Sequence, residues 1–246
     1  MNRPTALVVG VGAARGLGAA LGRRFAAAGH HVLLAGRTAA KLGEAVRGIE
    51  AAGGSAEAVV ADATRQDDVV GLFDRASAPT AGHDAVDLVV FNAGDNRRAG
   101  LRDTDAELFE AFWRVGCLAG FLVGREAARR MAPLGRGTVI FTGATGSLRG
   151  GAGFAAFAAA KAGLRMVAQS MAREFGPQGL HVAHVVIDGG IDGERLRRAF
   201  PERAAAAAED GLLDPDAIAE TYWQIHRQPR SAWTHELDLR PFREPF

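Results

Sequence analysis

The sequence has few of the features that indicate a secreted, membrane-bound or nucleic-acid-binding protein. Cys117 is the only cysteine, so no disulfide can form within the chain and no metal cluster can be built from its thiols. Basic and acidic side chains number 29 and 28, and a net charge of +1 indicates no polyelectrolyte partner. The first apolar run is interrupted by Gly10 and Gly12, too early for a membrane span. We expect a cytoplasmic protein that binds neither nucleic acid nor membrane, without a metal site.

Length and hydrophobic pattern predict one α/β domain over residues 1–246. With 48% hydrophobic residues, the chain suits a single core better than two small ones. Most apolar runs are continuous rather than alternating, as burial under helices on both faces of a sheet requires. The pattern predicts a Rossmann-like, doubly wound sandwich with a seven-stranded parallel sheet. The predicted strands are 6–11, 31–35, 56–61, 86–91, 137–141, 181–187 and 233–239.

A glycine-rich turn follows the first predicted strand and opens a helix. Its glycines would let the backbone turn sharply and approach a pyrophosphate, and the free amides at the helix start favour an anion. A glycine pattern alone is weak evidence, but its place between a strand and a helix favours nucleotide binding. The predicted phosphate-binding residues are Gly12, Arg15, Gly16, Leu17 and Gly18.

Three motifs, each at the end of a predicted strand, make the sequence resemble a short-chain dehydrogenase/reductase over nearly its whole length. The family's Thr-Gly-x-x-x-Gly-x-Gly pattern falls on 11–18, with Val11 in place of the threonine. Asp62 and Ala63, after the third strand, resemble the family's contact to the adenine ring. After the fourth strand comes the family's Asn-Ala-Gly motif, here Asn92, Ala93 and Gly94. The resemblance implies a nicotinamide cofactor and a small-molecule substrate.

The end of the second predicted strand favours NADP(H) over NAD(H). An NAD-preferring site needs a carboxylate there for the ribose 2'-hydroxyl, but this chain has Gly36 followed by Arg37. The guanidinium of Arg37 suits a 2'-phosphate, and Arg15 could reach the same group. Arg37 could instead be an ordinary solvated loop residue.

The catalytic positions implied by the resemblance have lost their acid and base groups. The family's tyrosine falls on Phe157, its serine on Ala144 and the asparagine of its long helix on Gly116. A benzyl side chain cannot exchange a proton with an alkoxide, so ordinary ketone reduction should be very slow. Lys161 is retained, and the resemblance implies that it holds the nicotinamide ribose.

Two other polar residues are candidate replacements in catalysis. Thr145 could orient a substrate carbonyl, but its hydroxyl is a poor proton donor without a relay. The Asp188 carboxylate, near the nicotinamide, could act as an acid or favour a cationic substrate or the oxidised cofactor. Asp188 could equally be a loop aspartate that caps local amides.

Two helical regions are predicted to serve the substrate and the assembly. The segment 193–212 is expected to cover the substrate, with a helix over 195–210 near the carboxyl ends of the strands. Gly116, Gly120 and Gly124 form a smooth stripe on one helix. The stripe suits a homodimer or homotetramer through helices 104–131 and 153–175, or close packing within one subunit.

Three functions fit these observations. The first is an NADP(H)-dependent oxidoreductase with an altered proton-donor system, acting on an iminium, a quinone-like acceptor or an activated alkene. The second is a cofactor-binding sensor without redox turnover, and the third is a non-redox isomerase or cyclase. We favour the first, because the phosphate turn, the Asn-Ala-Gly motif and Lys161 together indicate a bound nicotinamide.

Overall fold

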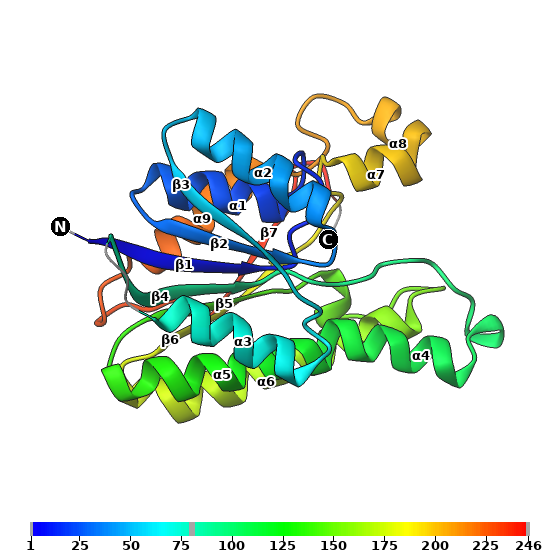
Figure 1. Ribbon diagram of the computed structural model, residues 1–246. Helices are drawn as coiled ribbons and strands as arrows, with labels where there is room; N and C mark the ends of the chain where they lie inside the picture. Colours follow the sequence, from blue (N-terminus) through cyan, green and yellow to red (C-terminus); the bar gives the residue numbers. More distant parts are fainter. Residues whose placement is uncertain (1, 79–81, 245–246) are drawn as a thin grey trace.

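The computed structural model describes residues 2–78 and 82–244 and shows a parallel sheet between two layers of helices (Figure 1). The strand order is β3-β2-β1-β4-β5-β6-β7, with every pair parallel. This confirms the predicted Rossmann-like fold in a single domain. The strands are β1 (Arg3–Val9), β2 (His31–Gly36), β3 (Ser55–Val60), β4 (His83–Phe91), β5 (Thr138–Thr142), β6 (His181–Ile187) and β7 (Glu236–Leu239).

The helices cover the sheet in two layers, each closing a hydrophobic core. One face carries α1 (Leu17–Ala27), α2 (Ala39–Ala51) and α9 (Pro215–His226) (Figure 1). The other carries α3 (Gln66–Ser77), α5 (Ala119–Met131) and α6 (Ala155–Phe175), with α4 (Ala106–Trp113) preceding α5. Short 3-10 turns lie at Leu101–Asp103, Ala132–Leu134, Thr145–Ser147 and Gly176–Gln178. Among the described residues, no helix is long and apolar enough to cross a membrane.

The last strand is shorter than the predicted range of 233–239. It begins at Glu236, because Trp233 leaves the sheet and stacks on the His181 ring with the centroids 4.7 Å apart. The start of this last strand therefore depends on side-chain contacts as well as on the hydrophobic pattern.

The glycine stripe packs within the chain. A Cβ at Gly116 would lie 2.9 Å from the Ala160 side chain, and one at Gly120 would lie 3.1 Å from Phe91. Gly124 faces Phe141 in the same way. The close approach that these glycines allow is thus between α5, α6 and the sheet, so the stripe gives no support for a subunit contact.

A π-helical turn, Arg114–Leu118, joins α4 to α5. It holds Gly116 and Cys117, and the Cys117 sulfur would lie 2.7 Å from a Cβ at Gly163 of α6. Cys117 therefore packs closely against α6. Turns of this kind are uncommon and are often found at functional sites.

The helix predicted over 195–210 is wrong, because two short helices replace it. These are α7 (Glu194–Ala199) and α8 (Pro201–Ala206), and the chain is not helical from Ala207 to Asp214. Pro201 is the reason for the break. It pushes the preceding residue away from helical angles, and Phe200 accordingly has φ −140° and ψ 65°.

Candidate cofactor and active site

The glycine turn after β1 is tightly packed on its inner side and open on its outer side. Gly10 has φ +100°, and a Cβ there would lie 2.5 Å from the Ala93 nitrogen. Gly18 packs against the same backbone, since its Cβ would be 2.9 Å from the Gly10 oxygen. A Cβ at Gly12 would meet nothing within 4 Å. The turn is therefore a cradle whose exposed backbone a ligand could approach closely.

The start of α1 has the properties of an anion site. Gly16 is its N-cap, with no side-chain hydrogen bond to the first amides and no acidic residue in the first turn. Free amides at a helix start, with the positive end of the helix dipole, attract a phosphate. The cradle and the helix start together fit a dinucleotide pyrophosphate.

The Asn-Ala-Gly segment after β4 supports this turn from the other side. The Asn92 side chain donates from Nδ2 to the Gly10 oxygen at 3.1 Å, and its backbone nitrogen donates to Val9 at 2.8 Å. These bonds tie the carboxyl ends of β1 and β4 together. Asn92 thus fixes the geometry of the turn, whereas Ala93 leaves room for the close approach of Gly10.

The two arginines of the expected phosphate site have different neighbours. Arg15 donates to the Asp192 carboxylate at 2.8 Å, whereas Arg37 is exposed and acts electrostatically on Asp62. Burial opposes ionisation of Asp62, but hydrogen bonds from Thr64 and the charge of Arg37 outweigh it and lower the pKa of the carboxyl. The turn and the loop after β2 thus carry separate positive charges.

Gly36 cannot be replaced by an acidic residue without a backbone shift. A Cβ there would lie 2.5 Å from the Val11 oxygen. The close packing of β2 against the glycine turn therefore leaves no room for an acidic side chain at position 36.

The segment around α7 contacts the loops that follow β1 and β4. The Glu194 nitrogen donates to the Arg15 oxygen at 2.9 Å. Arg195 donates to the Gly94 oxygen at 3.1 Å and to the Asp95 carboxylate at 2.9 Å. Since the Arg195 and Arg15 ion pairs are largely exposed, each contributes roughly 0–1 kcal/mol to stability.

Lys161 is buried near the carboxyl ends of β4 and β5. Its side chain donates from Nζ to the Thr142 oxygen at 2.7 Å, and the residue is only 5% exposed. A Cβ at Gly94 would be 3.3 Å from the same Nζ, so the ammonium lies between the ends of β4 and β5. Burial, reinforced by the charge of Arg195, lowers the pKa of Lys161 to about 8.

The position four residues before Lys161 carries no phenol. Position 157 is a half-buried phenylalanine whose ring packs against Gly146 and Phe154. The only tyrosine of the sequence is Tyr222, which is fully buried and donates to the Thr142 hydroxyl at 2.9 Å. Burial raises the pKa of Tyr222. Its hydroxyl is therefore occupied inside the core and is a very weak acid.

Thr145 and Asp188 are brought together, in contact with each other. The Thr145 hydroxyl donates to the Asp188 carboxylate at 2.5 Å, although the residues are 43 positions apart. Asp188 is 1% exposed and also lies 3.0 Å from Arg240 and 3.4 Å from Arg149. Its charge is thus matched within the protein. Thr145 lies in the turn that follows β5, beside Ala144.

A second buried network, which the sequence did not predict, supports this turn. His184 approaches the Ser147 hydroxyl at 3.3 Å through Nε2 and the Glu236 carboxylate at 2.9 Å through Nδ1. Ser147 in turn accepts from the Ala144 nitrogen at 3.1 Å. Burial lowers the pKa of His184 to about 4, although Glu236 opposes that change. The imidazole is neutral at physiological pH and positions the Ala144–Ser147 turn.

Known proteins share this architecture. A family model described as short chain dehydrogenase matches residues 5–203. Gluconate 5-dehydrogenase of Gluconobacter oxydans (strain 621H) is 33% identical over 228 residues, covering 93% of this chain and 82% of that protein. The chain belongs to the short-chain dehydrogenase family. This family comprises NAD(P)-dependent oxidoreductases.

Solved structures of short-chain dehydrogenases superpose on nearly the whole chain. A short-chain dehydrogenase from Rhodopseudomonas palustris is 41% identical, with a TM-score of 0.82, and the match covers 97% of this chain and 99% of that chain. A metagenomic short-chain oxidoreductase in complex with NADP is 26% identical, with a TM-score of 0.81, covering 98% and 97%. The glycine turn of this short-chain dehydrogenase family member thus lies in a fold that holds NADP in a similar protein.

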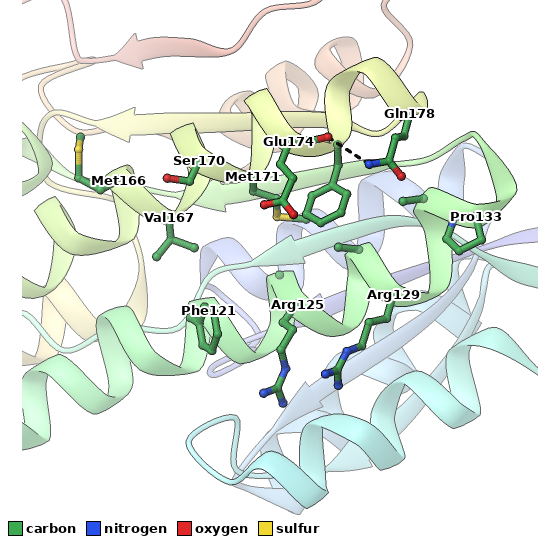
Figure 2. Close-up of a pocket in the computed structure, with 14 residues that line it drawn as sticks. Phe121, Arg125, Arg129, Pro133, Met166, Val167, Ser170, Met171, Glu174 and Gln178 are labelled. Carbon is green, nitrogen blue, oxygen red and sulfur yellow. Dashed lines mark hydrogen bonds between the residues drawn. The ribbon is translucent and has the colours of Figure 1, made fainter.

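A large apolar groove of this short-chain dehydrogenase lies along α5 and α6 (Figure 2). It measures about 720 Å³. Phe121 and Met166, 43% and 48% exposed, lie at its mouth, and Arg125 and Glu174 line it.

Proposed function

We propose that the protein is an NADP(H)-dependent oxidoreductase that transfers hydride without a phenolic proton donor. Lys161 carries the proposal, because its ammonium is buried at a cost in stability and lies at the carboxyl ends of β4 and β5. It lies beside Gly94 and below the α7 segment, where the family resemblance places the nicotinamide ribose. The residues proposed to hold the cofactor are Gly12, Arg15, Gly16, Leu17, Gly18, Arg37, Asp62, Ala63, Asn92, Ala93, Gly94 and Lys161.

NADP(H) is the proposed cofactor rather than NAD(H). Gly36 leaves no carboxylate to repel a 2'-phosphate, and the exposed Arg37 offers a guanidinium beside Asp62. A guanidinium binds phosphate through paired, charge-assisted hydrogen bonds. The bound NADP in a similar structure supports this assignment.

The proposed active site lacks the family's catalytic acid. We infer that Phe157, Ala144 and Gly116 occupy the positions of its tyrosine, serine and asparagine. Reduced nicotinamide, when bound, would supply a hydride, and reduction of an iminium to an amine needs no proton besides it. With a quinone-like acceptor or an activated alkene, water completes the protonation. Lys161 orients the ribose in this proposal, and Thr145 and Asp188 shape the wall beside the reacting carbon.

Binding and turnover measurements test this function directly. We expect NADPH to bind more tightly than NADH, and NADPH to be oxidised by imines, quinones or enones faster than by simple ketones. Tighter binding of NADH would contradict the cofactor assignment. Absence of turnover with every class would contradict the proposed reaction.

A cofactor-binding sensor is the second candidate. It is favoured by the contacts of the two candidate residues, since the Thr145 hydroxyl is bound to the Asp188 carboxylate, which also lies beside Arg149 and Arg240. Tight NADPH binding without turnover on any of these substrates would identify this function.

The α5–α6 groove is proposed to bind a second copy of this short-chain dehydrogenase, giving a homodimer or homotetramer. Phe121 and Met166 would be buried there, and Arg125 and Glu174 supply complementary charges. Light scattering should give a mass of at least two chains, which Phe121→Glu should reduce to one. A monomeric mass for the unmodified protein would contradict this assembly.

A further inference from the structure

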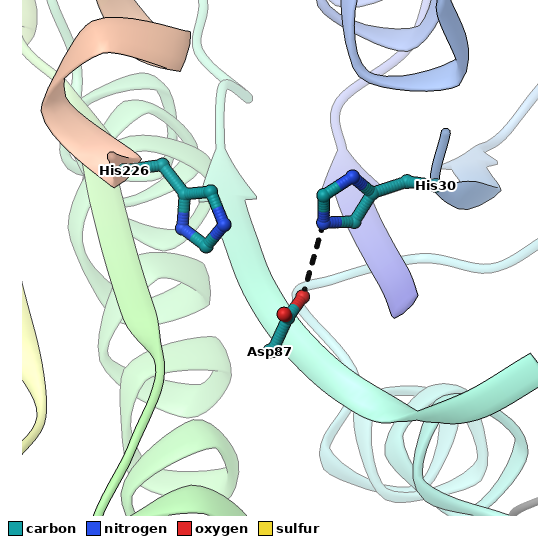
Figure 3. A group of neighbouring side chains, drawn as sticks. All are labelled: His30, Asp87 and His226. Atoms are coloured by element: carbon teal, nitrogen blue, oxygen red, sulfur yellow. Dashed lines mark hydrogen bonds and ion pairs between the residues drawn. The ribbon is translucent and has the colours of Figure 1, made fainter. Parts of the chain in front are cut away.

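Two histidines and an aspartate meet at the amino ends of the strands, at the opposite edge of the sheet from the glycine turn. His30 lies between α1 and β2, Asp87 belongs to β4, and His226 is the last residue of α9 (Figure 3). One ligand atom of each lies within 4.8 Å of the others. None of the three belongs to the proposed cofactor or active site.

An irregularity of β4 places the Asp87 carboxylate in this cluster. Thr5 of β1 lies opposite Val86, but the next residue, Ala6, lies opposite Leu88, so Asp87 is an extra residue in the strand. Val86 packs in the core under α3 and α5, whereas Leu88 packs in the core under α1 and α9. Such a bulge redirects a side chain and is frequent next to functional sites.

One ring nitrogen of each histidine faces the Asp87 side of the cluster (Figure 3). The His226 Nδ1 lies 2.9 Å from the Thr138 hydroxyl, which leaves Nε2 turned toward the other two residues (Figure 3). The His30 Nε2 lies 3.2 Å from the Asp87 carboxylate. His30 is 3% exposed, so this pair is largely shielded from water.

These separations fit a tetrahedral metal. With metal–ligand bonds of about 2.0–2.1 Å, neighbouring ligand atoms of a tetrahedron stand about 3.3 Å apart. His30 and Asp87 already have this spacing at 3.2 Å. The 4.8 Å limit on the other separations means that closure needs a movement of at most about 1.5 Å. A rotation of the His226 ring at the helix end can supply it.

We propose that His30, Asp87 and His226 bind a divalent transition metal of the zinc class. Two imidazoles and one carboxylate match zinc in ligand type, and three protein ligands leave a fourth position open. The site adjoins a cavity of about 220 Å³ that is also lined by His181. The His181 Nε2 is bound to the Thr234 oxygen, and its buried Nδ1 has no hydrogen-bond partner within the described part of the chain. That nitrogen can accept a hydrogen bond from a zinc-bound water.

Zinc binding by the complete, tag-free chain tests the proposal. After dialysis against a chelator, zinc chloride should bind with one ion per chain by calorimetry and elemental analysis. Cobalt should give the intense visible absorption of a tetrahedral site. His226→Ala and the near-isosteric Asp87→Asn should each weaken zinc binding by about 100-fold or more, since even losing an outer-shell partner costs about 10–100-fold.

His83→Ala is the matched control, because His83 stacks on His31 and offers a different imidazole pair with centroids 4.1 Å apart. Its zinc affinity should equal that of the unmodified protein. Failure to bind zinc would overturn the proposal. Binding that survives both His226→Ala and Asp87→Asn would do the same.

Discussion

Replacing Lys161 with methionine tests two properties of this residue. One is the effect of its buried ammonium on the free energy of unfolding, and the other is its contribution to cofactor binding. The native pKa of about 8 compares with an ordinary value of 10.5. At about 1.36 kcal/mol per pH unit, that difference is worth about 3 kcal/mol. Below pH 8 the buried charge lowers the free energy of unfolding by about this amount. The hydrogen bond to Thr142 returns about 1.5–3 kcal/mol, so Lys161→Met should change stability at pH 7 by less than about 2 kcal/mol.

The sign of the pH dependence follows from the lowered pKa. Between pH 8 and 10.5 the unfolded chain binds more protons at Lys161 than the native protein does, so the stability contribution of this residue rises with pH. The unmodified protein should gain up to about 3 kcal/mol relative to Lys161→Met across this window. Lys41 is the only other lysine, so few other groups titrate there.

Guanidinium unfolding at a series of pH values, together with NADPH titrations at pH 7, provides the assay. NADPH affinity should fall by about 10–100-fold in Lys161→Met, as expected for a lost charged hydrogen bond. Lys41→Met is the control, with the native pH profile and native NADPH affinity. Parallel pH profiles for the unmodified protein and Lys161→Met would refute the buried charge. Unchanged NADPH affinity would refute its role at the cofactor.

Three further predictions concern the phenol, the phosphate and the core. Phe157→Tyr combined with Ala144→Ser should raise ketone reduction by about 100-fold or more, since a positioned acid contributes about 10²–10⁴-fold; no gain would show that the pocket has been remodelled. Arg37→Ala should weaken NADPH binding by about tenfold and leave NADH binding unchanged. Arg65→Ala is the control. Equal losses of affinity for the two cofactors would contradict the 2'-phosphate contact. Tyr222→Phe should lower the free energy of unfolding by about 1–2 kcal/mol by leaving Thr142 unpaired, without changing NADPH affinity; loss of affinity would show that this buried hydroxyl acts at the site.

The sheet and the cofactor turn were predictable because their signals are local. Continuous valine, leucine and isoleucine runs report burial on both faces of a strand, and the glycine turn lies between a strand and a helix along the chain. The break between α7 and α8 also had a local signal, Pro201, which the alanine-rich composition obscured. No local signal indicated what the glycine stripe packs against, because periodicity identifies a helix face but not what covers it.

The contacts of the site depend on the fold. Thr145 meets Asp188, and Ser147 meets His184, across separations of 43 and 37 residues. The meeting of His30, Asp87 and His226 depends in addition on one extra residue in β4. No spacing rule identifies such groups in a single sequence, since their members lie on different elements.

We propose that this short-chain dehydrogenase retains a cofactor site and lacks a proton donor. The most direct test compares a preformed iminium with the ketone of the same carbon skeleton, following NADPH oxidation by the unmodified protein under identical conditions. We predict that the iminium is reduced and that the ketone reacts at least about 100-fold more slowly, as the loss of a positioned acid implies. Reduction of the ketone as fast as the iminium would contradict the account.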